Sequence, residues 1–311
     1  MTFVRDVYFA EWRGGISVSG TTGRGRQQRS PQKAAAADRY MRFLVTFAID
    51  AEFNPWKARH AFVPYDYDNS GRKRDFDMYR ANIANHEVTV LLTGMGGARA
   101  TKAMRIIPPE QHDMWISTGL AGALDAGLQL GATVVARAVM TRDAARKILS
   151  EPDFVSVAVS LAATPVDTFL TSETIVAKSE EKEALASSAS VVEMESTHIL
   201  AAALDRQIPA VAVRAISDIA EEDLPLDFQK IADDRGHVKV GGLLRELALH
   251  PYRLPLLIRF GRHSRAAAVS LADFLDRFLP ALAEDARRTA VANEWAASSA
   301  KAVARKQGWL Q

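Results

Sequence analysis

The sequence contains no cysteine among its 311 residues, which excludes disulfide bonds, thiolate nucleophiles and cysteine-ligated metals. Its seven histidines show no HExxH or comparable ligand spacing, so we expect no metal site. No apolar run approaches the roughly 18 residues that a membrane-spanning helix requires. An excess of one charge is also missing, because 39 basic residues face 37 acidic ones. This balance creates no general attraction for polyanions, and we expect no nucleic-acid partner.

The composition is otherwise that of an ordinary globular protein, with 48% hydrophobic and 24% charged residues. A chain of this length can bury a large core in one or two domains. We therefore expect a globular protein of the cytoplasm.

The first 40 residues differ from the rest of the chain. Ile16 and Val18 are almost the only large apolar side chains between residues 14 and 37, and residues 1–40 carry seven basic and three acidic side chains. Such a segment buries too little apolar surface to order itself, so we expect disorder. A targeting peptide or a nucleic-acid-binding tail is an alternative, although the apolar stretch of a secretory signal is missing. Met41 is a candidate native start.

From residue 42 onward, short apolar runs alternate with helical patterns. We expect strands at residues 43–49, 88–92, 114–117, 132–140, 154–159, 190–193 and 210–216. We expect helices at residues 50–61, 98–106, 197–204, 240–249 and 254–278. This alternation is typical of a largely parallel sheet. We predict an α/β fold, a single three-layer domain whose central, mixed, largely parallel twisted sheet is flanked by helices. The domain spans residues 41–250, and residues 251–311 form a C-terminal helical extension.

Charged side chains stand at the ends of the last two expected strands. Glu195 follows the run at residues 190–193, and Arg214 and Asp218 end the run that begins at Val211. Because strand ends in an α/β sheet face the ligand crevice, we expect these three side chains in one pocket. A purely structural ion pair between Arg214 and Asp218 is the alternative.

Glycine-rich turns follow two of the other strands, at residues 94–99 (GMGGAR) and 118–123 (TGLAGA). The first partly matches the GxGxxG/A dinucleotide fingerprint. Arg99 stands at its third position, however, and the turn follows the second strand rather than the first, which argues against a nicotinamide cofactor. The alternatives are a tight strand-to-helix turn, or backbone N–H groups that hold an anion or ribose at a helix N-terminus.

The order of these motifs resembles the nucleoside phosphorylase and nucleosidase superfamily, whose members cleave N-glycosidic bonds of nucleosides. The resemblance covers about residues 42–250. Six segments carry it: residues 48–52 (AIDAE), 93–96 (TGMG), 118–124 (TGLAGAL), 131–135 (GATVV, with Ala132 in place of the family's acid), 192–196 (VEMES, the ribose motif) and 214–218 (RAISD).

Within this superfamily the sequence is most similar to the hopanoid-biosynthesis-associated phosphorylases. The similarity lies in residues 119–122 (GLAG), 194–196 (MES) and the extension from 224–225 (LP) to 250–259 (HPYRLPLLIR). It implies removal of adenine from an adenosylated hopane lipid. A methylthioadenosine/adenosylhomocysteine-type nucleosidase is the alternative.

The resemblance implies roles for individual residues. Asp218 would be the general acid at purine N7, and Glu52 would position the attacking water. Arg214 would face the nucleophile rather than pair tightly with Asp218. Glu195 would accept hydrogen bonds from the ribose hydroxyls, and Met194 would pack on the sugar or base. Further substrate contacts are expected from Glu193, Ile175, Gly94, Gly96, Thr118, Gly119, Leu120, Ala121 and Ser217.

Two positions depart from the family pattern. Ile175 stands where a base-stacking aromatic residue is common, and Leu120 stands where many members carry a hydroxyl that touches phosphate or water. Thr93, Thr118, Arg214 and loop N–H groups remain to hold phosphate. Hydrolysis and phosphorolysis both stay open, with a slight preference for phosphorolysis from the subgroup resemblance.

No cofactor is expected, and inorganic phosphate is a candidate co-substrate. The expected partner is a small-molecule nucleoside, and the superfamily implies a homo-oligomer. Two other classes stay open. One is a nucleoside-binding or sensing module without turnover, which the departure at Leu120 suggests. The other is a membrane-surface protein whose basic helix at residues 254–278 lies on anionic lipid. For that helix we favour packing on the sheet.

Overall fold

The computed structural model describes residues 40–65, 75–108, 111–143, 145–225 and 254–306, and for residues 291–306 it describes the backbone alone. The elements are β1 (Arg42–Phe47), α1 (Asp50–Lys57), β2 (Val63–Pro64), β3 (Met78–Ile83), β4 (His86–Leu92), α2 (Gly97–Met104), β5 (Met114–Ser117), β6 (Leu120–Ala123), β7 (Thr133–Thr141), β8 (Lys147–Leu149), α3 (Pro152–Ser160), β9 (Thr164–Thr171), α4 (Ser179–Ala186), β10 (Val191–Glu193), α5 (Ser196–Leu204), β11 (Ala210–Asp218) and α8 (Leu254–Lys306). The expected helix at residues 240–249, like residues 1–39, lies outside this range.

The strands form one mixed sheet in the order β2-β3-β4-β1-β5-β11-β6-β10-β9-β7-β8. β1 runs parallel to β4 and β5, and β11 runs parallel to β5 and β6. β11 also pairs with β7, so β11, β6, β10, β9 and β7 close into a ring. The predicted mixed, largely parallel sheet is confirmed, but its closure at one end was not predicted.

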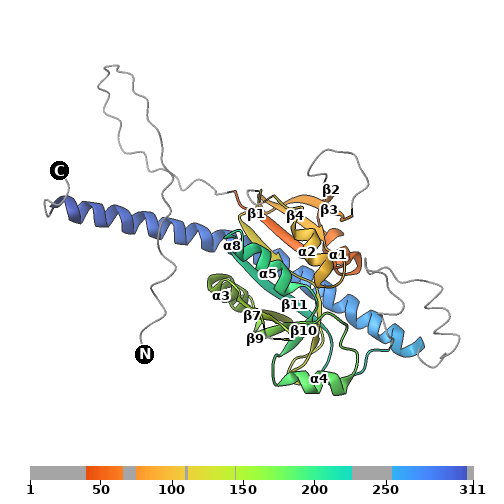
Figure 1. Cartoon of the computed structure of the whole chain (residues 1–311). Coiled ribbons are helices and arrows are strands. Elements are labelled where there is room, and N and C mark those ends of the chain that lie inside the picture. Colours follow the sequence, from red (N-terminus) through yellow and green to blue (C-terminus); the bar gives the residue numbers. More distant parts are fainter. Residues whose placement is uncertain (1–39, 66–74, 109–110, 144, 226–253, 307–311) are drawn as a thin grey trace. The chain divides into compact units, whose positions relative to one another are not determined.

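Helices cover both faces of the sheet, as the three-layer prediction requires. Phe53 of α1, Phe154 of α3 and Phe274 of α8 belong to one buried cluster with the residues of one sheet face. Ala100 of α2 and Leu200 of α5 belong to the cluster on the other face. In Figure 1, α2 and α5 lie in front of the sheet and α8 runs behind it.

Residues 154–159 form a helix, α3, where we expected a strand. Pro152 suits the first helical position, because a proline there loses no intrahelical hydrogen bond. The buried Phe154, Val155 and Ala158 follow helical spacing. Valine-rich sequence favours a strand only weakly, and packing against the core overrides that preference. The true strand, β9, comes after this helix.

Several other elements were missed by the sequence analysis. They are β2, β3, β6, β8, β9 and α4. β6 begins at Leu120, inside the glycine-rich turn that we expected to be a loop. The charged sequence SEEKEALA of α4 shows little apolar periodicity, and the sequence therefore did not predict this helix.

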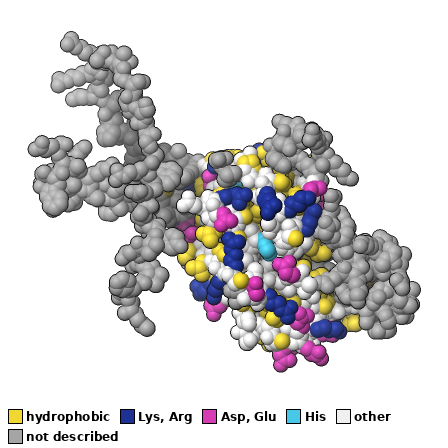
Figure 2. Space-filling model, viewed as in Figure 1, with side chains coloured by type: hydrophobic (Ala, Val, Ile, Leu, Met, Phe, Trp, Pro, Cys, Tyr) yellow, Lys and Arg dark blue, Asp and Glu magenta, His cyan; other side chains and the backbone are white. Residues whose placement is uncertain are grey.

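α8 packs on the sheet, as we favoured for this part of the chain. Its buried Ala267, Leu271, Phe274 and Phe278 recur at the spacing of one helix face. Among the described residues, no helix combines the length and apolar character needed to cross a membrane. On the face drawn in Figure 2, basic and acidic side chains of the described residues are interspersed.

Candidate active site

The carboxyl ends of β1, β5 and β11 lie at one edge of the sheet, because these strands are parallel. The chain leaves β1 and reaches Glu52 on α1, whereas β11 ends at Asp218 itself. Gly122 of β6 is paired with both Asp218 of β11 and Val192 of β10. This double pairing brings Glu195, just beyond β10, toward the end of β11.

A β-bulge sets the direction of the Asp218 side chain. The register of β11 against β6 shifts between Ile216 and Asp218. Bulges of this kind re-aim a side chain and are common beside active sites. A Cβ atom at Gly122 would lie 2.8 Å from Asp218 Oδ2. Glycine at position 122 therefore leaves the room that this carboxyl group occupies.

Asp218 is paired with a lysine that the sequence analysis did not identify. Lys182 Nζ donates to Asp218 Oδ2 at 2.6 Å, and Ser217 Oγ donates to Oδ1 at 2.8 Å. The Lys182 side chain is 0% exposed. The charged sequence of α4 is typical of a solvent-exposed helix. Only the three-residue spacing of Lys182 and Leu185 indicates a buried face.

Glu52 is held by backbone N–H groups from two strand ends. Leu120 N–H donates to Oε1 at 2.9 Å, and Ala48 N–H donates to Oε2 at 2.9 Å. Gly119 has φ +141°, and a Cβ atom there would lie 3.0 Å from both carboxylate oxygens. Burial raises the pKa of Glu52, although the Leu120 N–H and the charge of Arg214 act in the opposite direction.

The guanidinium group of Arg214 lies close to the carboxyl groups of Glu193 and Glu195. Its Nη2 donates to Glu193 Oε2 at 2.6 Å and to Ser196 Oγ at 3.0 Å, and lies 3.7 Å from Glu195 Oε2. The tight partner of Asp218 is thus Lys182, and Arg214 binds the glutamates instead. Glu193 contacts Arg214 through Nη2, and the nucleophile-facing role that the resemblance implied stays a prediction.

Glu193 and Glu195 are both buried, and their pKa values move in opposite directions. Burial raises the pKa of Glu193, but Arg214, the Thr171 hydroxyl and two backbone N–H groups outweigh it, so that the pKa is lowered. For Glu195, burial and the neighbouring charge of Glu193 raise the pKa to about 8 against the attraction of Arg214. Of the two carboxyl groups, Glu195 is therefore the one that binds a proton more readily.

The glycine-rich turn after β4 binds this glutamate. Gly96 has φ +87°, and its N–H donates to Glu195 Oε1 at 2.7 Å. A Cβ atom at Gly97 would lie 2.1 Å from His198 Nε2, so the second glycine allows α2 to pack closely on α5. The turn thus serves helix packing and anchors a carboxyl group of this chain.

The hydroxyl groups expected to hold phosphate donate to backbone carbonyls. Thr118 Oγ1 donates to Thr46 O at 2.7 Å, and Thr93 Oγ1 donates to Gly94 O at 2.9 Å. Neither hydroxyl proton is directed to an anion in this arrangement.

A cavity of about 1000 Å³ joins these groups. Nine of the expected site residues line it: Glu52, Leu120, Ala121, Ile175, Glu193, Met194, Glu195, Ser217 and Asp218. The other five lie outside its lining: Arg214, Gly94, Gly96, Thr118 and Gly119. Away from the carboxyl groups the wall is mostly apolar, and it includes Leu224 and, from α8, Leu257, Phe260 and Val269; Arg59 and Arg265 also line it. In the described part of the chain, no group of three or more His, Asp or Glu side chains is arranged to hold a metal ion.

The sequence profile of the phosphorylase superfamily matches residues 42–248. The chain belongs to the phosphorylase superfamily. A 5′-methylthioadenosine/S-adenosylhomocysteine nucleosidase from Colwellia psychrerythraea is 27% identical over 188 residues, which make up 50% of this chain and 76% of that protein. The crystal structure of the Colwellia nucleosidase with adenine has a TM-score of 0.58 at 20% identity, covering 78% of this chain and 96% of that one. The Campylobacter jejuni nucleosidase has a TM-score of 0.59 at 16% identity, covering 77% and 98%.

Membership of the phosphorylase superfamily confirms the resemblance seen in the motifs, and the structural likeness confirms the fold. The expectation of an enzyme that acts on N-glycosyl bonds of nucleosides is confirmed at this level. The narrower resemblance to the hopanoid-associated group stays a prediction.

Proposed function

We propose that this protein hydrolyses the N-glycosidic bond of an adenosine-type nucleoside. The observation that carries the proposal is the cavity that Glu52, Glu195 and Asp218 share, since these side chains come from distant segments of the chain. Cleavage leaves positive charge on the ribose and negative charge on the departing purine. A site with an acid at one end and anionic oxygens at the other can stabilise both charges.

Asp218 serves the leaving base. As the C1′–N9 bond breaks, its electron pair goes to the purine, and the carboxyl proton of Asp218 passes to N7. General acid catalysis of this kind contributes about 10² to 10⁴ in rate. Ser217, which donates to Oδ1, helps to orient the carboxyl group.

Glu195 serves the ribose. Gly96 N–H holds Oε1, and the carboxyl group lines the cavity, so it can accept a hydrogen bond from a sugar hydroxyl. Positive charge developing on the ribose favours ionised Glu195, although its pKa is about 8 without ligand. Met194 lines the same wall, and its flexible thioether can pack against the sugar or base.

Water is the nucleophile that the described charges favour. A phosphate dianion in this cavity would meet the charge of Glu193, whose pKa is lowered, and like charges repel strongly in a buried site. Arg214 is already bound by Glu193. Two other arginines line the cavity: Arg59, which is bound by Asp273 and Asp276, and Arg265 of α8. A water molecule held by Glu52 meets no such repulsion. Its oxygen bonds to C1′ and its proton passes to Glu52. The geometry thus supports hydrolysis over the slight preference for phosphorolysis that the subgroup resemblance suggested.

The apolar part of the cavity supports a substrate with a large apolar 5′ substituent. The volume of about 1000 Å³ lies at the upper end of the range of ordinary ligand pockets. Leu257, Phe260 and Val269 of α8 extend the wall beyond the carboxyl groups. We therefore propose an adenosylated hopane lipid as the substrate, with 5′-methylthioadenosine as the alternative.

The test is an assay of adenine release by the full-length protein, with and without inorganic phosphate. Adenosylhopane and 5′-methylthioadenosine are compared as substrates, and the reaction is repeated in ¹⁸O-labelled water. We expect phosphate-independent release from adenosylhopane and one ¹⁸O atom in the sugar product. A sugar phosphate product would refute hydrolysis. Release from 5′-methylthioadenosine alone would refute the lipid substrate, and binding without release would support a sensing module.

A further inference from the structure

Lys182 is a completely buried cation beside the proposed acid. Its Nζ donates to Asp218 Oδ2 at 2.6 Å, to the carbonyl of Ile219 at 2.7 Å and to the carbonyl of Glu222 at 3.1 Å. These three bonds use all the donors of an ammonium group. The group is therefore fixed in direction and cannot turn away from Asp218 without losing a bond.

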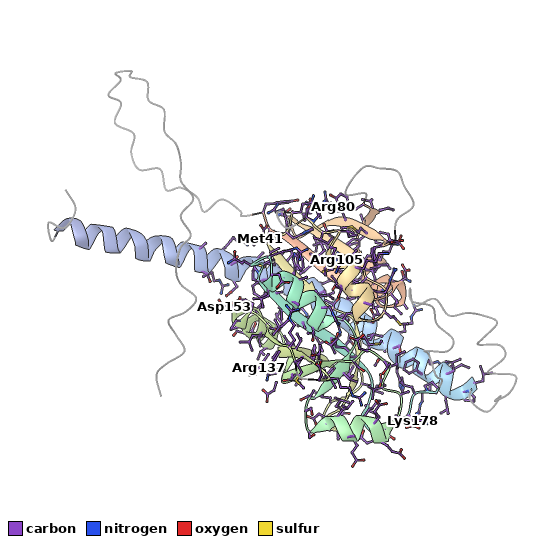
Figure 3. All side chains as sticks on the ribbon, viewed as in Figure 1. Met41, Arg80, Arg105, Arg137, Asp153 and Lys178 are labelled. Atoms are coloured by element: carbon purple, nitrogen blue, oxygen red, sulfur yellow. The ribbon has the colours of Figure 1, made fainter. Side chains whose placement is uncertain are left out.

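The surroundings of α4 hold this lysine in place. Leu185, three residues after Lys182, packs in a small apolar cluster against the ring of strands. At the start of the helix, Asp223 accepts hydrogen bonds from Ser179 N–H at 2.8 Å and from Lys178 Nζ at 2.7 Å. Figure 3 labels Lys178 at this end of α4.

Burying an ammonium group costs desolvation free energy, which a favourable interaction of its charge has to offset. An apolar side chain of similar length would fill the same space without losing hydration. The carboxyl group of Asp218, which accepts the hydrogen bond from Lys182, lines the cavity. Its position is restricted, because Lys182 binds Oδ2 and a Cβ atom at Gly122 would lie 2.8 Å from that same oxygen. The charge of Lys182 thus acts on the group proposed to protonate the base.

We infer that Lys182 is a positioning residue that strengthens Asp218 as the acid for the leaving purine. The inference rests on the proposed function. When the Asp218 carboxyl proton passes to N7, the electrons of the C1′–N9 bond go to the base and a carboxylate is left behind. The ammonium 2.6 Å away compensates that new charge, while Lys182 keeps its own protons. Water then adds to C1′ and gives its proton to Glu52.

The charge of Lys182 acts on Asp218 directly, through the hydrogen bond to Oδ2. Other charged groups around the pair have partners of their own: Glu222 binds Arg259, Asp223 binds Lys178, Glu181 binds Arg142 and Glu193 binds Arg214. Glu52 and Glu195 line the same cavity. Arg59 and Arg265 line it too, and Arg59 binds Asp273 and Asp276. Among these cations, Lys182 is the one that donates a hydrogen bond to Asp218.

The experiment compares Lys182→Met, Asp218→Asn and the double variant with the wild-type enzyme. Adenine release from an adenosine-type nucleoside is measured as kcat and KM across pH. We expect Lys182→Met to lower kcat tenfold or more, as part of the about 10² to 10⁴ that general acid catalysis contributes. KM changes little. In the Asp218→Asn background the same substitution adds no further loss.

Lys102→Met is the matched control, since this lysine also binds an aspartate, Asp75, but its side chain is 58% exposed and it lies on α2. Lys182→Gln replaces Lys182→Met if circular dichroism shows that the latter does not fold. A wild-type kcat in the position 182 variants, or an equal loss in the Asp218→Asn background, would overturn the role of Lys182 alone. Absence of adenine release by the wild-type enzyme would overturn the proposed function and this inference together.

Discussion

Neighbouring glutamates of one short segment have opposite preferences for a proton. Arg214 Nη2 lies 2.6 Å from Glu193 Oε2 but 3.7 Å from Glu195 Oε2. The nearer carboxyl group keeps its charge, and that charge in turn disfavours ionisation of Glu195. Burial raises the pKa of Glu195 most, and the larger distance from Arg214 leaves this effect less opposed than at Glu193.

Glu195→Gln should make the stability of the protein less sensitive to pH. The pKa of Glu195 rises from 4.5 to about 8 in the folded protein, which therefore binds more protons than the unfolded chain between these values. The free energy of unfolding consequently falls as pH rises through this window, and the variant lacks that loss. Melting temperatures across the window measure the effect. Glu183→Gln, an exposed substitution, should keep the wild-type slope, and equal slopes in all three proteins would contradict the assignment.

Gly122→Ala should reduce activity while preserving the fold. The new Cβ atom would lie 2.8 Å from Asp218 Oδ2, so the carboxyl group has to move away from the base. Misplacement of a reacting group by about 1 Å can cost about 10² in rate. Measurement of kcat for adenine release, with Gly127→Ala as an exposed control, tests this expectation. An unchanged kcat in the Gly122→Ala variant would show that catalysis does not depend on the present position of the Asp218 carboxyl group.

At the scale of single elements, α8 is part of the core. Phe274 and Phe278 are buried, and their rings lie 4.9 Å apart between centroids. They share one cluster with β1, α1 and α3. The same helix contributes Phe260 and Leu257 to the cavity wall. α8 thus contributes side chains both to the hydrophobic core and to the cavity wall.

Phe274→Ala should lower the free energy of unfolding by about 3–5 kcal/mol, because it removes a buried ring and leaves a cavity. Urea denaturation followed by circular dichroism gives the value. Arg288→Ala is the control on the same helix, since its exposed pair with Glu284 is worth about 0–1 kcal/mol. Similar losses in both variants would contradict the packing of α8 described here.

At the scale of the whole molecule, we propose that the start of α8 contacts anionic membranes. Leu254, Leu256 and Ile258 are between 44% and 48% exposed, and exposed arginines follow them at positions 262 and 265. Leu257 of the same segment lines the cavity, so a lipid-linked substrate could enter from the bilayer. Apolar and basic side chains together are typical of helices that lie on membrane surfaces.

Flotation with phosphatidylglycerol vesicles tests this contact. We expect the full chain to float with the vesicles at low salt and to be released at high salt, because salt screens the arginine charges. Leu254→Ser combined with Ile258→Ser should weaken flotation, whereas Leu149→Ser, at an exposed position of β8, should not. Wild-type protein that stays with the unbound fraction would refute the proposal.

The sequence predicted the elements whose signal is local. β1, β4, β5, β10 and β11 lie where apolar runs end in glycine or charged residues, and α5 follows the ribose motif as expected. The strand-end pattern predicted one pocket for Glu195, Arg214 and Asp218; Glu195 and Asp218 line one cavity together with Glu52, whereas Arg214 lies outside its lining. α3 was assigned wrongly because its valines favour strands, while the packing of Phe154 and Val155 favours a helix.

By itself, the sequence determined the superfamily, the layered α/β fold and the acidic groups of the site, because these depend on the kind and order of residues along the chain. Only the tertiary structure decided which charges meet. In the folded chain Arg214 donates a hydrogen bond to Glu193 and Lys182 donates one to Asp218. The hydroxyl groups of Thr93 and Thr118 donate to backbone carbonyls. Such pairings depend on strand register and helix placement across tens of residues, and no local pattern records a partner that lies 36 positions away.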